Sequence, residues 1–142
     1  MTTHLAIAPD FDPTVALAQA KELRETTRDT DLPVVCVGDY NSTASDSTNP
    51  TFETYQSFID AGFVDTWRQT HPVDLGFTCC QSPDVSNAES SLSQRIDLIL
   101  AKGRIDIVNA VLVGDKQADR TPSGLWPSDH AGVTATLQPD KE

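Results

Sequence analysis

The stretch Pro33-Val34-Val35-Cys36-Val37-Gly38 is an unbroken apolar run, and Asp39-Tyr40-Asn41 follows it directly. A short apolar run that ends in glycine is typical of a strand buried on both faces. Loops that carry functional residues gather at the ends of such strands in α/β proteins. The stretch therefore predicts a central strand whose end bears site residues.

Hydrophobic periodicity on either side of this strand predicts a mixed set of elements. The turn residues Lys102-Gly103-Arg104 predict that the two strands beside them form a hairpin. The order of elements indicates one α/β domain over 1–142, with a mixed β-sheet and helices on one side. In chain order, we expect a strand at 2–8, a helix at 13–28, a strand at 33–38, a helix at 52–61, a short strand at 63–67, and strands at 95–101, 105–113 and 131–137.

The composition excludes several functional classes. The chain has 142 residues and a formal net charge of −11. Between Asp29 and Gln94 the only basic residue is Arg68, so a broad duplex-binding face is not expected. No apolar run approaches the roughly 20 residues of a membrane span, and Met1–Leu5 shows no signal peptide. The carboxylates either confer solubility or, in part, hold a metal ion.

Three cysteines do not make a disulfide framework. Cys36 is expected to be a small core residue. Cys79 and Cys80 are adjacent, and neighbouring cysteines rarely bridge each other. They also lack the spacing of a zinc site. One of them could pair with a cysteine outside this chain, so the compartment stays open.

Four polar clusters fall at the ends of predicted strands. Glycine-rich phosphate loops and nucleophile elbows are absent from the sequence, which leaves carboxylates, an amide and histidines. Such a set suits a hard cation such as Mg²⁺ with an activated water. A histidine there could act as a base or stabilise the transition state, oriented by a carboxylate. The clusters are Thr3-His4-Leu5, Gly38-Asp39-Tyr40-Asn41, Arg95-Ile96-Asp97 and Ser128-Asp129-His130.

In order and spacing, these clusters resemble the serial motifs of the endonuclease/exonuclease/phosphatase superfamily, the DNase I-like metal-dependent phosphoesterases. The third cluster continues the resemblance through Leu98-Ile99-Leu100. The likeness spans almost the whole chain. A looser likeness of Gly76-Phe77-Thr78-Cys79-Cys80-Gln81 points to a bacterial, often secreted, branch. The localisation itself stays unassigned.

The resemblance implies a role for each matching residue. It implies that His130 works on the scissile phosphate and that Asp97 orients it. Asp39 would position or deprotonate the attacking water and contribute to the metal site. Asn41 would help to hold that water and the phosphoryl oxygens. The two remaining roles are phosphate contact by His4 and binding or support of the metal by Asp129, with Mg²⁺ (or Mn²⁺ or Ca²⁺) as the cation.

The resemblance covers only the later half of the family's four-layer α/β sandwich. The family's earlier half carries an asparagine and a glutamate that bind the main metal ion, and this sequence has no counterpart before Met1. We therefore expect a C-terminal part of the fold that needs the other half for full activity. One apolar sheet face would lack its partner, which predicts poor solubility or a homodimer through that face.

The leading interpretation is metal-dependent hydrolysis of a phosphodiester or phosphomonoester. A phosphorylated small molecule, a lipid head group or a short nucleotide is the expected substrate, because the acidic charge disfavours duplex binding. The alternatives are a non-catalytic interaction domain that retains the fold and a nonspecific nuclease. A plain structural domain ranks last, because it requires four accidental motif matches.

Overall fold

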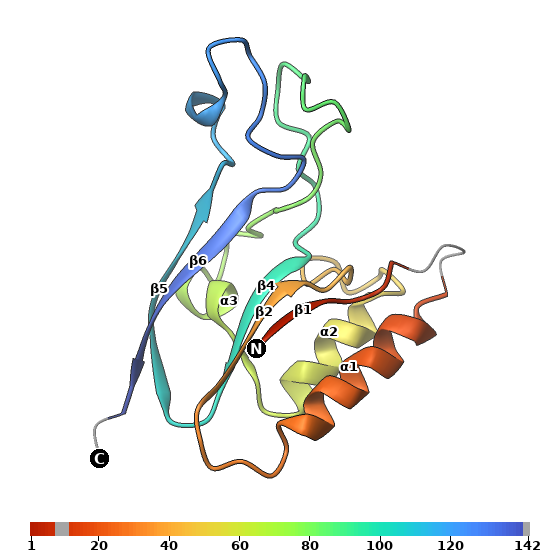
Figure 1. Cartoon of the computed structure of the whole chain (residues 1–142), viewed down its shortest axis with the longest axis vertical. Coiled ribbons are helices and arrows are strands. Elements are labelled where there is room, and N and C mark those ends of the chain that lie inside the picture. Colours follow the sequence, from red (N-terminus) through yellow and green to blue (C-terminus); the bar gives the residue numbers. More distant parts are fainter. Residues whose placement is uncertain (8–11, 141–142) are drawn as a thin grey trace.

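The computed structural model describes residues 1–7 and 12–140. A four-stranded mixed sheet has the order β1-β2-β4-β3, with β1 parallel to β2 and β4 antiparallel to both neighbours. A separate antiparallel ribbon joins β5 and β6 (Figure 1). The bounds are β1 Thr2–His4, α1 Thr14–Thr26, β2 Val34–Asp39, α2 Phe52–Asp60, β3 Val64–Asp65, α3 Thr66–Thr70, β4 Asp97–Lys102, β5 Ile105–Val113, a 3₁₀ turn Gln117–Asp119 and β6 Gly132–Pro139.

The expected α/β class, with a mixed sheet and helices on one side, is confirmed. Helices α1 and α2 lie together against one face of the four-stranded sheet (Figure 1). Pro13 occupies the cap position of α1, and the Asp12 carboxylate before it accepts a hydrogen bond from the Thr14 N–H at 2.9 Å. Helix α3 was not predicted, and its first turn is capped by the Asp65 carboxylate. The first strand, predicted at 2–8, is shorter in the structure: β1 ends at His4, residues 5–7 are not part of a strand, and residue 8 lies outside the described residues.

The predicted hairpin between 95–101 and 105–113 is wrong. Strand β5 pairs with β6 along most of its length, from Ile105 opposite Pro139 to Val113 opposite Gly132. The edge of β4 where a hairpin would begin is already occupied, because β3 pairs with Leu100 and Ala101 there. Hydrophobic alternation predicts that a segment is a strand, but it does not predict which other strand it pairs with.

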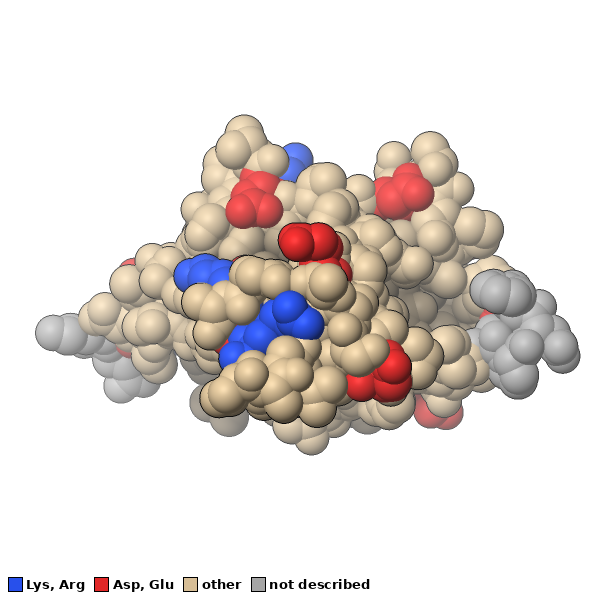
Figure 2. All heavy atoms as spheres, turned by 90° about the horizontal axis from the view of Figure 1, so that it is seen from above, with Lys and Arg blue, Asp and Glu red and all other residues tan. Residues whose placement is uncertain are grey.

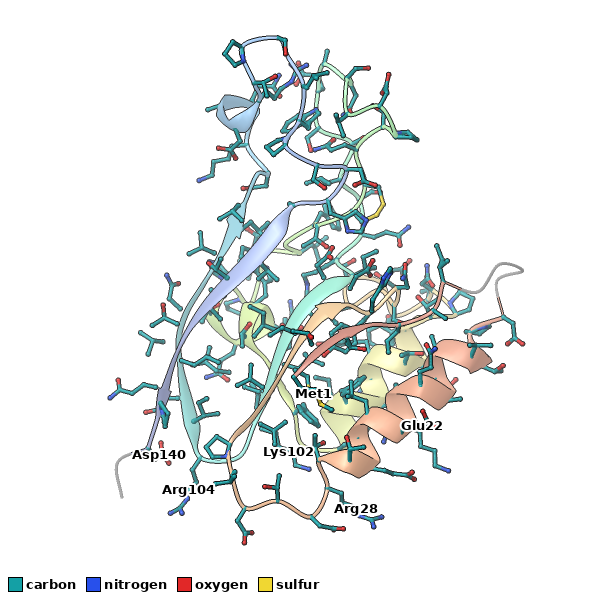
Figure 3. All side chains as sticks on the ribbon, viewed as in Figure 1. Met1, Glu22, Arg28, Lys102, Arg104 and Asp140 are labelled. Carbon is teal, nitrogen blue, oxygen red and sulfur yellow. A yellow bond between two sulfur atoms is a disulfide. The ribbon has the colours of Figure 1, made fainter. Side chains whose placement is uncertain are left out.

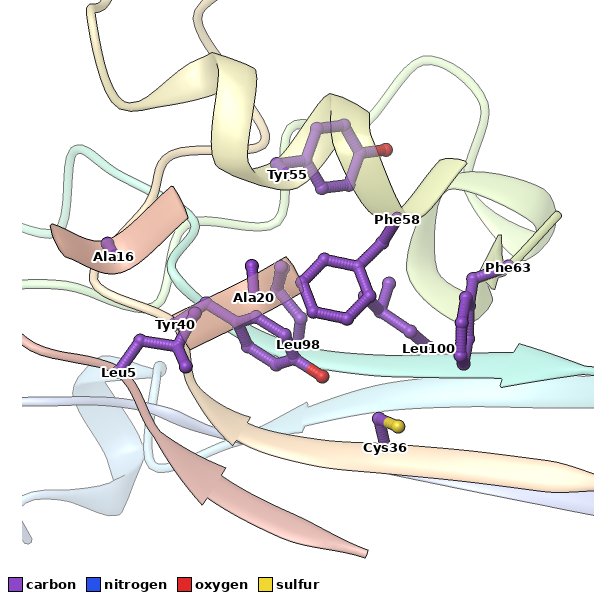
Figure 4. Close-up of a cluster of buried hydrophobic side chains, with 10 residues drawn as sticks. All are labelled: Leu5, Ala16, Ala20, Cys36, Tyr40, Tyr55, Phe58, Phe63, Leu98 and Leu100. Atoms are coloured by element: carbon purple, nitrogen blue, oxygen red, sulfur yellow. The ribbon is translucent and has the colours of Figure 1, made fainter. Parts of the chain in front are cut away.

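The core lies between the sheet and the two long helices (Figure 4). Cys36, Leu98 and Leu100 point from β2 and β4 toward α1 and α2, and each is almost fully buried. The Phe58 ring packs edge-on against Tyr40, with 5.2 Å between ring centroids. The expectation that Cys36 is a small core residue is thus confirmed.

The opposite face of the sheet is less covered. Side chains alternate between faces along a strand, so Val35, Val37 and Ile99 point away from the helices. All three are only half-buried. Beside them β5 and β6 add further half-buried apolar side chains, including Leu112 and Val133. The sheet face away from the helices is therefore apolar and partly covered, and its covering by a second copy stays a prediction.

Two long loops form a lobe at the top of Figure 1, above the end of the sheet where β4 begins. Residues 80–93 and 114–127 contact each other through side-chain hydrogen bonds to main-chain carbonyls. The Trp126 indole N–H donates to the Asn87 carbonyl at 2.8 Å, and Gln117 donates to the Ala88 carbonyl at 2.6 Å. With Trp126 only 2% exposed, the lobe has a small core of its own. Among the described residues, no helix is both long and apolar enough to cross a bilayer.

Candidate active site

Strand register brings three of the expected residues into one row. His4 lies opposite Asp39 across β1 and β2, and Asp39 lies opposite Asp97 across β2 and β4. Residues paired in this way project from the same face of a sheet, here the face away from the helices. The His4 ring Nε2 lies 3.5 Å from the Asp39 carboxylate. Three separate motifs therefore meet at one end of the sheet.

His130 completes this row from the segment that leads into β6. Its Nδ1 lies 2.8 Å from Oδ2 of Asp97. Asp39, Asp97 and His130 each offer a ligand atom, and these atoms all lie within 4.8 Å of one another. A carboxylate on one imidazole nitrogen fixes the ring orientation and leaves the other nitrogen for a ligand or substrate. The expected His–Asp dyad is thus present in the structure.

Asn41 follows β2 in a left-handed conformation, with a φ of 46°. Asparagine tolerates this region better than most residues do. Its main-chain N–H donates to Oδ1 of Asp39 at 2.8 Å, and its side-chain amide donates to the Leu5 carbonyl at 2.8 Å. The turn therefore holds the Asp39 carboxylate and ties it to the segment after β1.

Asp129 lies next to this group rather than within it. Its carboxylate is exposed and accepts a hydrogen bond from the Ser128 hydroxyl at 3.2 Å. Its main-chain carbonyl accepts from the Gln81 N–H at 2.7 Å, which joins the loop before β6 to the upper lobe. Asp129 and His130 both line a cavity of about 510 Å³, so the two neighbours face the same space. Other lining residues are Ala6, Asn41, Thr51, Cys79, Cys80 and Ile96.

Burial and charge alter the proton affinities of the group. Burial raises the pKa of Asp39, and the negative charge of Asp97 raises it further. For His130, burial lowers the pKa, but the hydrogen bond and charge of Asp97, with Asp39 and Asp129, outweigh it and leave the pKa raised. The site therefore holds two close carboxylates that repel each other, beside a histidine whose pKa is raised. Shifted pKa values of this kind are common at functional sites.

Two groups that position Asp97 could not be recognised from the sequence. The buried Thr78 hydroxyl accepts from the N–H groups of both Ile96 and Asp97, each at 3.1 Å. Two residues before Asp97, the Arg95 guanidinium pairs with the Asp65 carboxylate at 2.6 Å, and both side chains are 4% exposed. These contacts join the start of β4 to loops far away in the chain. Only a pairing signal between distant residues could have revealed them.

Cys79 and Cys80 are joined by a disulfide in this structure, contrary to the expectation that adjacent cysteines do not bridge (Figure 3). The two cysteines lack zinc-site spacing in the sequence, but in the structure a histidine lies beside them. The Cys80 Sγ lies 4.0 Å from Nε2 of His130. Sequence spacing could not show this, because His130 lies 50 residues further along the chain.

Acidic side chains are spread over the face of the molecule at the lobe end. On the face seen from above in Figure 2, Asp and Glu side chains are scattered and Lys and Arg form only small separate groups. The basic residues Arg28, Lys102 and Arg104 lie at the other end of the molecule from the disulfide (Figure 3). This face therefore presents no continuous basic surface to a nucleic-acid duplex.

Comparison with known proteins agrees with the arrangement of these motifs. The sequence model of the Endonuclease/Exonuclease/phosphatase family matches residues 3–130. Comparison with curated proteins finds no match. Among solved structures, an endonuclease/exonuclease/phosphatase family protein from Bacteroides thetaiotaomicron is 18% identical with a TM-score of 0.72, and the match covers 99% of this chain and 49% of that one.

Two further solved structures have the same fold. The 3′ phosphatase NExo from Neisseria, bound to a product DNA hairpin, is 20% identical with a TM-score of 0.68, over 92% of this chain and 55% of that chain. A mannosyl-6-phosphatase from Bacteroides thetaiotaomicron is 20% identical with a TM-score of 0.66, over 96% and 49%. The chain thus spans about half the length of the structures that it matches.

Proposed function

The chain belongs to the endonuclease/exonuclease/phosphatase family, and from that premise we propose that it contributes to the divalent-cation-dependent hydrolysis of a phosphate ester. The observation that carries the proposal is the 2.8 Å contact between His130 and Asp97, beside Asp39 and at the wall of a cavity. Phosphoryl transfer needs donors and charges that are already in place where negative charge develops. The row of residues across β1, β2 and β4 has that character.

In the proposed mechanism, His130 acts on the phosphoryl group. Asp97 accepts the Nδ1 proton of the imidazole, so that Nε2 is the nitrogen available to the substrate. The raised pKa of His130 increases the share of the imidazolium at any given pH relative to an ordinary histidine. In that form Nε2–H donates to a phosphoryl oxygen as charge develops on it. Asp97 holds the ring in place and stabilises its positive charge.

Asp39, Asn41 and His4 serve the water and the phosphate. The Asp39 carboxylate orients the attacking water or accepts its proton. Asn41, held by its bonds to Asp39 and Leu5, lies at the cavity wall and helps to hold the water and a phosphoryl oxygen. The His4 ring, with a side chain that is 75% exposed, contacts the phosphate from the solvent side.

Asp39 and Asp129 are the proposed ligands of a cation. The residues fit a hard divalent ion, because carboxylate oxygens are the ligands that Mg²⁺, Mn²⁺ and Ca²⁺ prefer. Burial and the nearby charge of Asp97 raise the pKa of Asp39, and a divalent cation would offset that unfavourable charge. When bound, the ion supplies charge stabilisation for the developing oxyanion.

The proposed substrate is a phosphorylated small molecule, a lipid head group or a short nucleotide. The net charge of −11 and the acidic groups scattered over the face seen in Figure 2 oppose binding of a long duplex. Among the matched structures, one is named as a mannosyl-6-phosphatase and another is bound to product DNA. The fold therefore serves both kinds of substrate in other proteins.

The proposal is tested by hydrolysis of bis-p-nitrophenyl phosphate and p-nitrophenyl phosphate with Mg²⁺ or Mn²⁺. We expect metal-dependent turnover that falls about 10²-fold or more in His130→Ala. His71→Ala is the matched control, because that ring stacks on Trp67 and is not part of the row. Absence of turnover with either ion after the other half of the family fold is supplied, or equal rates in His130→Ala, would identify a non-catalytic domain instead.

A further inference from the structure

Cys79 and Cys80 lie against the ring of His130, on the side that Asp97 does not occupy. The Cys80 Sγ is 4.0 Å from Nε2, while Asp97 contacts Nδ1 at 2.8 Å. One atom each from Cys79, Cys80 and His130 lies within 4.8 Å of the other two. Two sulfurs and one imidazole nitrogen thus converge on the same small volume.

The main chain holds these three residues in register. Cys79 forms antiparallel bridges to Gln94 on one side and to His130 on the other. The Cys79 and Gln94 N–H groups each donate to the carbonyl of the other residue at 2.9 Å, and the Ala131 N–H donates to the Thr78 carbonyl at 2.8 Å. The proximity of sulfur and imidazole is therefore built into backbone pairing rather than into a free loop.

The ligand types favour a cation different from the one proposed above. Thiolate sulfur and imidazole nitrogen select thiophilic ions such as Zn²⁺, whereas Mg²⁺ and Ca²⁺ prefer oxygen. A histidine that binds such an ion through one nitrogen commonly donates its other N–H to a carboxylate, and Asp97 is placed to accept it. Cys80 is exposed at the cavity, so an ion can reach the pair from solvent.

We propose that, when both thiols are reduced, Cys79, Cys80 and His130 form a binding site for one thiophilic divalent cation such as Zn²⁺, and that the Cys79–Cys80 disulfide closes this site. Three protein ligands leave a fourth position for water, as in other open zinc sites. The structure holds the pair in its closed, oxidised state.

The two states interconvert by thiol–disulfide exchange with a small dithiol. The dithiol supplies two electrons and two protons, the Cys79–Cys80 bond breaks to give two thiols, and the reductant becomes a cyclic disulfide. On binding, each cysteine loses its thiol proton to solvent and the cation takes the two thiolates and the imidazole nitrogen. Electrons and protons balance in both steps.

The site has a consequence that rests on the function proposed above. The cation would occupy Nε2 of His130, the nitrogen assigned to the phosphoryl oxygen. A thiophilic ion would then inhibit the reduced protein and leave the disulfide form unaffected. Metal identity and thiol state would together control access to a single histidine.

The experiment is a Co²⁺ titration of the dithiol-reduced, desalted protein without substrate, in excess Mg²⁺ to occupy oxygen ligands. We expect a sulfur-to-cobalt charge-transfer band that saturates at one Co²⁺ per chain and disappears on addition of Zn²⁺. The disulfide form should give no band. Cys80→Ser should abolish it, and Cys36→Ser should retain it, because Cys36 is buried in the helix-side core.

His130→Ala tests the third ligand, and we expect it to weaken Co²⁺ binding by at least about tenfold. A band that is absent from the reduced protein or that persists in Cys80→Ser would overturn the proposal. Unchanged affinity in His130→Ala would overturn it too, since the cysteines would then bind the ion without the histidine. The titration is read without turnover, so its failure is distinct from failure of the phosphoesterase proposal.

Discussion

Oδ2 of Asp97 lies 2.8 Å from Nδ1 of His130, although the two residues are 33 positions apart in the chain. Asp97 begins β4 and His130 precedes β6, so the contact joins the four-stranded sheet to the two-stranded ribbon. Besides Asp97, the charges of Asp39 and Asp129 also act on the ring and raise its pKa. The contact therefore couples the architecture to the charge of the site.

The first prediction concerns the titration of His130. We expect its pKa, followed by NMR of the imidazole, to lie above 6.5 and to fall in Asp97→Asn, because burial then acts with less opposition. A raised folded-state pKa means that the pair stabilises the fold fully below the unfolded-state pKa. This stabilisation is lost as the pH rises through the folded-state pKa. Asp106→Asn, on exposed β5, should leave the titration unchanged, and an equal pKa in Asp97→Asn would contradict the assignment.

The second prediction separates activity from stability at Asp39. Burial and the charge of Asp97 raise its pKa, so the ionised carboxylate destabilises the fold at neutral pH. Because Asp39 is proposed to orient or deprotonate the attacking water, Asp39→Asn should lower phosphoester turnover about 10²-fold. It should also raise the melting temperature by roughly a few degrees, as a change of up to about 1 kcal/mol does in a domain of this size.

The gain in melting temperature should shrink as the pH falls through the raised folded-state pKa of Asp39, and it should vanish below the ordinary value of 3.8, where the carboxyl group is protonated in both states. Thermal melts at pH 5 and pH 8 measure this trend. Asp46→Asn is the control of opposite sign, because hydrogen bonds from Thr48 lower the pKa of Asp46, so its charge is not a source of instability. A lower melting temperature for Asp39→Asn at pH 8 would show that the carboxylate stabilises the fold.

Features of the fold and the site that depend on neighbouring residues could be predicted from the sequence, whereas those that depend on distant segments could not. The row of His4, Asp39 and Asp97 follows from strands that carry a polar residue at one end, and each strand has its own local signal. The partner of β5 depends on β3 occupying an edge of β4, which is a competition between distant segments. The two cysteines lie beside His130 because the main chain of Cys79 pairs with that of His130, and sequence spacing does not reveal such a pairing.

The third prediction concerns the buried ion pair behind the site. Asp65 accepts from the N–H groups of Trp67 and Arg68 and from the Tyr55 hydroxyl, and pairs with Arg95. Asp65→Ala leaves the Arg95 charge buried without its partner, which typically costs about 3–5 kcal/mol. Urea denaturation measures this loss.

Asp60→Ala is the matched control for that variant. Asp60 is exposed and its carboxylate accepts a hydrogen bond from Gln56 on the same helix, so its loss should change the free energy of unfolding by about 0.5 kcal/mol or less. If Asp65→Ala cost no more than Asp60→Ala, the network around Arg95 would not stabilise the fold.

The last prediction concerns the sheet face away from the helices. Val35, Val37 and Ile99 are half-buried there, beside the apolar side chains of β5 and β6. Open apolar faces of this kind are rare on monomers, and two copies can cover each other in a symmetric pair. We expect light scattering to show self-association of the purified chain, weakened by Ile99→Lys. Val73→Lys is the control, since Val73 is 93% exposed outside the sheet. A monomer at high concentration, or equal association of Ile99→Lys and the unaltered chain, would mean that the face is not an interface between copies.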